Sequence, residues 1–275
     1  MTQHTTQEAD QPTASLVINV MFEQWAPGVA PGLGPMGNPL PVGTLDYQAV
    51  SWADYGWRTG VWAVLDLLKK ESSPATFYVS GILSETAPEA LRAIAEAGHE
   101  ISGHSWSQDR IPALISRSEE LDEIVRCTEA IAAVSGQRPR GWISPRCTPS
   151  ASTSELLIQA GYQWWGDVFD ADLPYWLDAP GGRIVALPFG LEINDLPMTV
   201  RYGQPTRELA ASFAYEARGL SAMKKGGHID VTLHAHVACR PAGLIALTEI
   251  INEAKRLGMP IVSRGDLVEG FLKTS

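Results

Sequence analysis

Polar and ionisable side chains follow six apolar segments of this chain, each time at the point where the segment ends. These side chains are Glu23, His104, Arg146, Asp167 with Asp170, Glu192 with Asn194 and Asp195, and His234 with His236. Hydrolysis of an amide needs a base that deprotonates water, a positive group that stabilises the oxyanion, and an acid that protonates the leaving nitrogen. Carboxylates, imidazoles and a guanidinium supply these groups. The set therefore predicts a hydrolytic site, provided that the fold brings the segment ends together.

The apolar runs alternate with segments of helical periodicity along the whole chain. The predicted strands cover 16–22, 75–79, 99–102, 141–144, 162–168, 184–188, 229–234 and 260–263, and the predicted helices cover 60–70, 88–97, 117–135, 152–160, 207–223 and 242–257. This alternation predicts an α/β fold in which helices cover a parallel sheet. The number of units favours a distorted (β/α) barrel, whose strands all end at one mouth. We expect one catalytic domain over residues 15–275, after a flexible tail over residues 1–14.

The composition excludes several classes of partner. The chain has 275 residues and a formal net charge of −10. An acidic chain without a basic stripe is poorly suited to bind nucleic acid or an anionic membrane. Three scattered cysteines do not form a disulfide framework, and no apolar signal segment opens the sequence. These features predict a cytoplasmic protein with a small-molecule substrate. Residues 26–46, rich in Gly and Pro, form a long loop that we expect to cover the site or reach a neighbouring subunit.

Several short motifs keep the order and spacing of a known superfamily. They are Ala75–Gly81, Pro88, Gly98–Ile101 and His104-Ser105. Together they resemble the polysaccharide deacetylase superfamily over roughly residues 16–270, which implies a barrel of that type. Further segments resemble its allantoinase-like branch, which includes cyclic imide hydrolases and opens cyclic amides. These are Gly141–Pro149, Asp170–Trp176, Asn194-Asp195, Leu233-His234 and Arg240–Ala242. By resemblance to this branch, we expect a homo-oligomer, either a dimer or a tetramer.

The chain departs from the metal-dependent members at the positions of their metal ligands. Those members carry two adjacent aspartates and two histidines spaced four apart. The aligned residues here are Glu23-Gln24, His104 and Gln108, and the usual arginine falls on Ile143. Neutral amides are poor ligands for zinc. The resemblance therefore implies catalysis without a metal cofactor, as in the allantoinase-like branch.

The favoured hypothesis is a hydrolase that opens a cyclic imide or a ureide such as allantoin. We expect Glu23 to act as the base, His104 and Arg146 to hold the oxyanion, and His234 to protonate the leaving nitrogen. Further residues are expected to bind the substrate ring. They are Trp25, Trp106, Trp142, Asp170, Asn194, Asp195 and His236.

Two alternatives stay open. The first is a deacetylase of N-acetylated sugars, with a divalent metal such as zinc bound by Glu23, His104 and His236. The second is an inactive barrel that serves as a binding module, which the joint presence of Glu23, His104 and His234 disfavours. Cys147, beside Arg146, has no histidine near it in the sequence, which disfavours a nucleophilic role for its thiol.

Overall fold

The computed structural model describes residues 14–29, 31–32, 34–35, 40–41, 43–223 and 226–274. Apart from Ala14, the predicted tail lies outside these residues, as does part of the predicted loop over 26–46. The strands are β1 (Ser15–Phe22), β2 (Thr76–Val79), β3 (Glu100–Gly103), β4 (Gly141–Trp142), β5 (Trp164–Trp165), β6 (Tyr175–Ala179), β7 (Gly182–Ala186), β8 (His228–His234) and β9 (Ile261–Val262).

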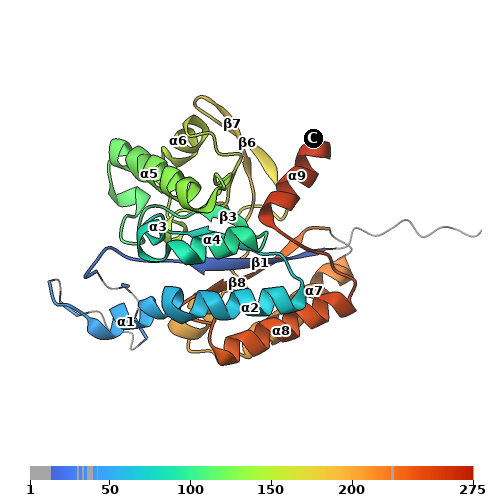
Figure 1. Ribbon diagram of the computed structural model, residues 1–275. Helices are drawn as coiled ribbons and strands as arrows, with labels where there is room; N and C mark the ends of the chain where they lie inside the picture. Colours follow the sequence, from blue (N-terminus) through green and yellow to red (C-terminus); the bar gives the residue numbers. More distant parts are fainter. Residues whose placement is uncertain are drawn as a thin grey trace, which may run out of the picture.

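The helices surround this sheet (Figure 1). They are α1 (Tyr47–Tyr55), α2 (Val61–Glu71), α3 (Leu83–Thr86), α4 (Pro88–Glu96), α5 (Arg117–Ser135), α6 (Thr153–Gln159), α7 (Glu208–Met223), α8 (Pro241–Arg256) and α9 (Arg264–Thr274), with the short helical turns η1 (Gly56–Gly60), η2 (Pro112–Leu114), η3 (Pro145–Cys147) and η4 (Leu196–Arg201). None of the helices in the described ranges is long and apolar enough to span a bilayer.

The sheet curls into a partly closed barrel. Its strand order is β6-β7-β5-β4-β3-β2-β1-β8, with β9 paired to β1. Every pairing is parallel except the hairpin of β6 and β7. A single parallel bridge between Asn194 and Thr232 joins the segment after β7 to β8. The predicted α/β fold, a distorted barrel of the polysaccharide deacetylase type, is confirmed.

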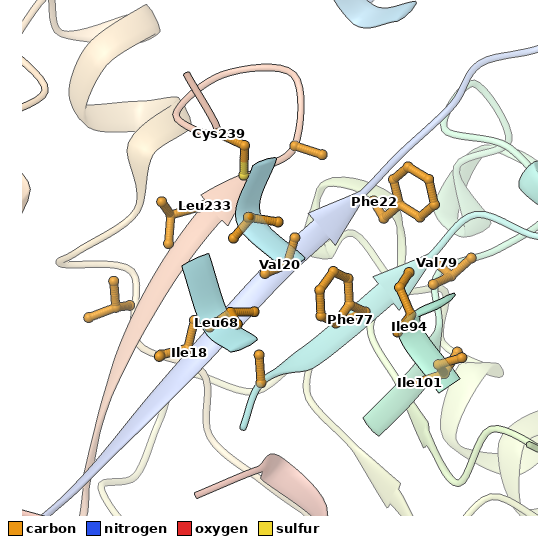
Figure 2. Close-up of a cluster of buried hydrophobic side chains, with 14 of the residues drawn as sticks. Ile18, Val20, Phe22, Leu68, Phe77, Val79, Ile94, Ile101, Leu233 and Cys239 are labelled. Atoms are coloured by element: carbon orange, nitrogen blue, oxygen red, sulfur yellow. The ribbon is translucent and has the colours of Figure 1, made fainter. Parts of the chain in front are cut away.

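Alternation along the strands separates an outer core from the interior of the barrel. Ile18, Val20 and Phe22 of β1 are fully buried and point outward, where they pack with Leu68 of α2 and Phe77 of β2 (Figure 2). Each fully buried side chain of this kind contributes about 1.5–3 kcal/mol relative to an exposed one. Successive residues of a strand face opposite sides, so the residues between them point into the barrel.

The barrel interior is apolar in the middle and polar at both ends. A second cluster of buried residues fills the middle: Met21, Tyr78, Ile143, Trp164, Val185, Leu187, Phe189 and Val268. At the amino end of the strands, the fully buried Arg264 forms an ion pair of 2.8 Å with Asp230, which also accepts a hydrogen bond from Asn19. At the carboxyl end, the alternation of β1 brings Glu23 to the same inner face as Met21. The apolar cluster therefore forms the floor beneath the predicted site.

Candidate active site

Four ionisable side chains meet at the carboxyl ends of β1, β3 and β8. Glu23 Oε1 lies 3.2 Å from His104 Nε2 and 3.8 Å from His234 Nε2, and Glu23 Oε2 lies 3.9 Å from His236 Nδ1. All four are buried, with exposed fractions of 7% for Glu23, 2% for His104, 5% for His234 and 1% for His236. The structure thus surrounds one carboxylate with three imidazoles. The predicted convergence of Glu23, His104 and His234 is present.

Two contacts of its ring nitrogens fix the orientation of His104. Its Nδ1 donates to the carbonyl oxygen of Ile143 at 2.7 Å, and its Nε2 faces Glu23 Oε1. Because the first contact needs a proton on Nδ1, the second is a hydrogen bond to a carboxylate only when Nε2 is also protonated. Burial alone would raise the pKa of Glu23, but His234 and His104 outweigh it and lower this pKa to about 2. Glu23 is therefore a carboxylate at neutral pH, which can accept a hydrogen bond from His104 Nε2.

Asp195 binds the ring nitrogen of His234 that points away from Glu23. Asp195 Oδ1 accepts from His234 Nδ1 at 2.6 Å, and Oδ2 accepts from the backbone N–H groups of His234 and Ala238. Burial disfavours a charged His234, but the charges of Asp195 and Glu23 overcome this effect and raise its pKa. This carboxylate is fully buried and engaged on both oxygens, which disfavours the expected contact of Asp195 with substrate. It positions His234 as a proton donor instead.

Two indoles enclose His236. The ring centroid of Trp25 lies 5.6 Å from that of His236, and the ring of Trp52 lies 4.6 Å away, both edge to face. Trp52 belongs to α1, which continues into η1. There, a Cβ on Gly60 would lie 1.9 Å from the carbonyl oxygen of Ala235, so only glycine permits this approach. The close contact fixes α1 against the loop that carries His236.

Several other predicted substrate contacts lie elsewhere. Trp142 is 1% exposed and packs edge to face on Tyr162 in the outer core, which disfavours its predicted contact with substrate. The side-chain oxygen of Asn194 accepts from the backbone N–H of Leu196 and caps the turn. Asp170 is exposed and accepts from the hydroxyl of Tyr175 at 2.9 Å, beside β6. These two polar residues stabilise local backbone and side chains rather than the cluster around Glu23.

Arg146 and Trp106 also lie outside the cluster. Arg146 is exposed, has a left-handed backbone with a φ of 57°, and forms no side-chain hydrogen bond or ion pair with the residues that the structure describes. The guanidinium of Arg126 stacks on Trp106 at 3.4 Å, which holds that indole beside α5. The structure therefore gives no support to Arg146 as the oxyanion residue. His104 remains for that role.

Two neighbours of the site have other tasks. Asp167 accepts hydrogen bonds from the backbone N–H of Ser144 and the indole N–H of Trp165, so it caps the chain after β4. Burial raises the pKa of the Cys147 thiol well above its ordinary value, and the charges of Asp167 and Glu23 raise it further. The thiol therefore stays protonated at neutral pH, which disfavours Cys147 as a nucleophile.

Of the residues around the cluster, sequence reasoning missed Trp52, because α1 has only two buried residues and a weak helical pattern.

The side chains present do not fit a metal centre. Gln24 Nε2 donates to Asp54 Oδ1, and Gln108 Nε2 donates to Ser80 Oγ and to the carbonyl oxygen of His104. Only the amide nitrogens are engaged in this way, and the oxygens that remain belong to neutral amides, which are poor ligands for zinc. Over the described ranges, no group of three or more His, Cys, Asp and Glu side chains has an arrangement that could hold a metal ion. This result also covers Glu23, His104 and His236, the alternative set of metal ligands, which do not have such an arrangement.

Comparisons with known proteins agree with this fold. The family model for polysaccharide deacetylase matches residues 49–165. A Schizosaccharomyces pombe protein that is classed by name with these deacetylases is 26% identical over 246 residues, covering 79% of this chain and 74% of its own. The peptidoglycan deacetylase of Helicobacter pylori is 30% identical over 142 residues, covering 51% of this chain and 48% of its own. Residues 49–165 thus resemble a polysaccharide deacetylase domain, in agreement with the motifs of the sequence.

A solved structure shows the same fold over nearly the whole chain. PuuE allantoinase superposes with a TM-score of 0.84 and 23% identity, covering 94% of this chain and 91% of that one. The matched family and the named relative are deacetylases, which are hydrolases that act on carbon–nitrogen bonds.

Proposed function

We propose that the protein hydrolyses a carbon–nitrogen bond in a small cyclic amide, either a cyclic imide or a ureide, with its own side chains and without a metal ion. The observation that carries the proposal is the buried Glu23 carboxylate between the imidazoles of His104 and His234, with Asp195 bonded behind His234. The allantoinase-like motifs of the sequence fit this assignment, and PuuE allantoinase shares the fold. The expected dimer or tetramer stays a prediction.

The proposed reaction uses the cluster as an acid–base pair. Glu23 takes a proton from water as the oxygen attacks the amide carbon, and His104 donates a hydrogen bond from Nε2 to the carbonyl oxygen, where negative charge develops. His234 then donates the proton on Nε2 to the leaving nitrogen as the carbon–nitrogen bond breaks. The site is left with a protonated Glu23 and a neutral His234. Transfer of the proton from Glu23 to His234 restores the starting state. Glu23 Oε1 and His234 Nε2 are 3.8 Å apart.

The size and character of the site favour a small planar substrate. Glu23 is only 7% exposed. Trp25 and Trp52 pack against His236, whose ring lies beside Glu23. The second candidate is a deacetylase of N-acetylated sugars, which the name of the Helicobacter pylori relative favours. That chemistry in its metal-dependent form needs ligands that Gln24 and Gln108 do not supply.

A panel of amides tests the assignment. Succinimide, hydantoin, dihydrouracil, allantoin and N-acetylglucosamine oligomers are incubated with the purified protein, and ring opening or acetate release is followed by chromatography. We expect turnover of at least one cyclic amide and no acetate release. Acetate release without ring opening would replace the proposal with the deacetylase. Ligand-induced thermal stabilisation without any turnover would identify a binding module.

The raised pKa of His234 predicts the pH dependence of this activity. The proton donor is the imidazolium, which is present at low pH and is lost as the pH rises through the raised pKa. The base is the carboxylate of Glu23, which stays charged above a pH of about 2. We therefore expect kcat/KM to fall on the alkaline side, with no acid limb from Glu23 between pH 5 and 7.

Asp195→Asn changes this profile in a defined direction. Loss of the Asp195 charge lowers the pKa of His234, so the alkaline limb moves to lower pH, and kcat falls by about 100-fold. Measurement of kcat/KM from pH 5 to 10 for both proteins checks the shift. An unmoved alkaline limb in a folded variant would show that His234 is not the acid.

A further inference from the structure

We propose that the imidazole of His236 holds the attacking water, which sits between His236 Nδ1 and Glu23 Oε2. This inference rests on the proposed function only in that an amide is hydrolysed by a water near Glu23. It differs from the sequence-based expectation, in which His236 contacts the substrate.

The first argument is an unpaired polar atom. His236 is 1% exposed, and its Nδ1 is buried without a hydrogen-bond partner among the residues that the structure describes. Buried polar atoms in folded proteins nearly always have a partner, either from the protein or from ordered water. The atom that Nδ1 faces is Glu23 Oε2 at 3.9 Å, too far for a direct hydrogen bond. One oxygen atom bridges such a span with two hydrogen bonds of about 2.8 Å each.

The second argument is that the two carboxylate oxygens of Glu23 face different partners. Oε1 faces both His104 and His234, at 3.2 and 3.8 Å. Oε2 accepts no hydrogen bond from the residues that the structure describes, and it lies 3.9 Å from His236 Nδ1. Oε1 therefore faces His104 and His234, and Oε2 is available to take a proton from water.

The third argument is the state and rigidity of the ring. Burial lowers the pKa of His236 to about 3, in spite of the nearby carboxylate, so the ring is neutral. Trp25 and Trp52 pack edge to face with the ring, and a Cβ on Gly56 would lie 3.2 Å from the backbone nitrogen of His236. A neutral imidazole with its proton on Nε2 accepts a hydrogen bond at Nδ1. Both hydrogens of the water are then bound, one by Glu23 and one by His236, which leaves its lone pairs directed at the substrate.

Three substitutions separate the roles of the two ring nitrogens. His236→Phe keeps the ring and its contacts with the indoles but removes both nitrogens. His236→Asn places an amide atom near the position of Nδ1, whereas His236→Gln places one near Nε2. Each variant is assayed on whichever amide the wild-type protein hydrolyses, and thermal unfolding confirms that it is folded.

We expect His236→Phe to lower kcat by 100-fold or more with KM changed by less than threefold. We expect His236→Asn to recover at least tenfold of this loss, and His236→Gln to recover none. A raised KM with unchanged kcat would overturn the inference in favour of substrate binding. Equal losses for Asn and Gln would also contradict it.

A crystal structure at 1.5 Å or better gives a test that needs no activity. We expect a water within hydrogen-bond distance of both Glu23 Oε2 and His236 Nδ1, and its loss in His236→Phe. An empty position in the wild-type protein would refute the inference. If the wild type released acetate instead of opening rings, the proposed substrate would be wrong, yet these tests would still decide the role of His236.

Discussion

Glu23→Gln is expected to lower kcat by at least about 1,000-fold, because it removes the only carboxylate that faces both His104 and His234 among the described residues. The amide of Gln is neutral and cannot accept the proton of water. It also removes the charge that helps to raise the pKa of His234, so the proton donor is weakened as well. Steady-state kinetics on the best cyclic amide of the panel measures the loss.

Glu23→Asp is the matched control for charge. It keeps the carboxylate but withdraws it by one methylene group, so we expect an intermediate loss in kcat. Circular dichroism and thermal unfolding show whether both variants are folded. A folded Glu23→Gln variant with kcat within tenfold of wild type would remove Glu23 from the mechanism.

Arg264→Met is expected to have the largest effect on stability. Arg264 is fully buried and pairs with both oxygens of Asp230, and its second amino group donates to the carbonyl oxygens of Leu187 and Pro188. Removal of one partner from a buried ion pair leaves an uncompensated charge and costs about 3–5 kcal/mol. We expect Tm to fall by roughly 6–20 °C, since each kcal/mol shifts Tm by about 2–4 °C in a chain approaching this size. Calorimetry measures the shift.

Arg256→Met provides the control for an exposed ion pair. Arg256 lies 2.6 Å from Glu253, a distance as short as that of the buried pair, but the side chain is 67% exposed. Solvent screens such pairs, so we expect little change in Tm. Equal shifts for the two variants would contradict the view that Arg264 and Asp230 stabilise the barrel interior.

The inward-facing site residues could be predicted because they obey strand periodicity. Alternation in the run over 16–22 points Ile18, Val20 and Phe22 to one side, and the next residue, Glu23, falls on the opposite face. His234 ends β8 in the same way, and parallel pairing brings both strand ends together. The sequence therefore contained enough information to join a carboxylate and two imidazoles at one mouth.

The roles of Asp195 and Trp142 could not be predicted, because they depend on which partner a side chain meets. Asp195 lies next to Asn194 in a turn, and only the folded loop shows that its oxygens bind His234 and Ala238. Trp142 precedes the site in the sequence, but its side chain leaves the strand on the outer face and packs on Tyr162. Identity and spacing alone do not distinguish a positioning carboxylate from a ligand-binding one.

Three of the longer elements of the fold also escaped sequence reasoning. α1 buries only Ala49 and Ala53, so its apolar pattern is too sparse to indicate a helix. β6 is half-exposed and pairs antiparallel to β7, which a repeating strand–helix pattern does not anticipate. α9 has a weak amphipathic pattern, with Val268 as its buried apolar side chain. In each case, tertiary contacts rather than local periodicity stabilise the element.

The central claim is that the side chains of this protein hydrolyse an amide without a bound cation. The most direct measurement is kcat/KM for ring opening by protein stripped of metal with a chelator, compared with the same protein after addition of zinc. The account predicts equal values for the two samples, with metal content below one ion per ten chains. Activity that disappears on stripping and returns in proportion to bound zinc would contradict it.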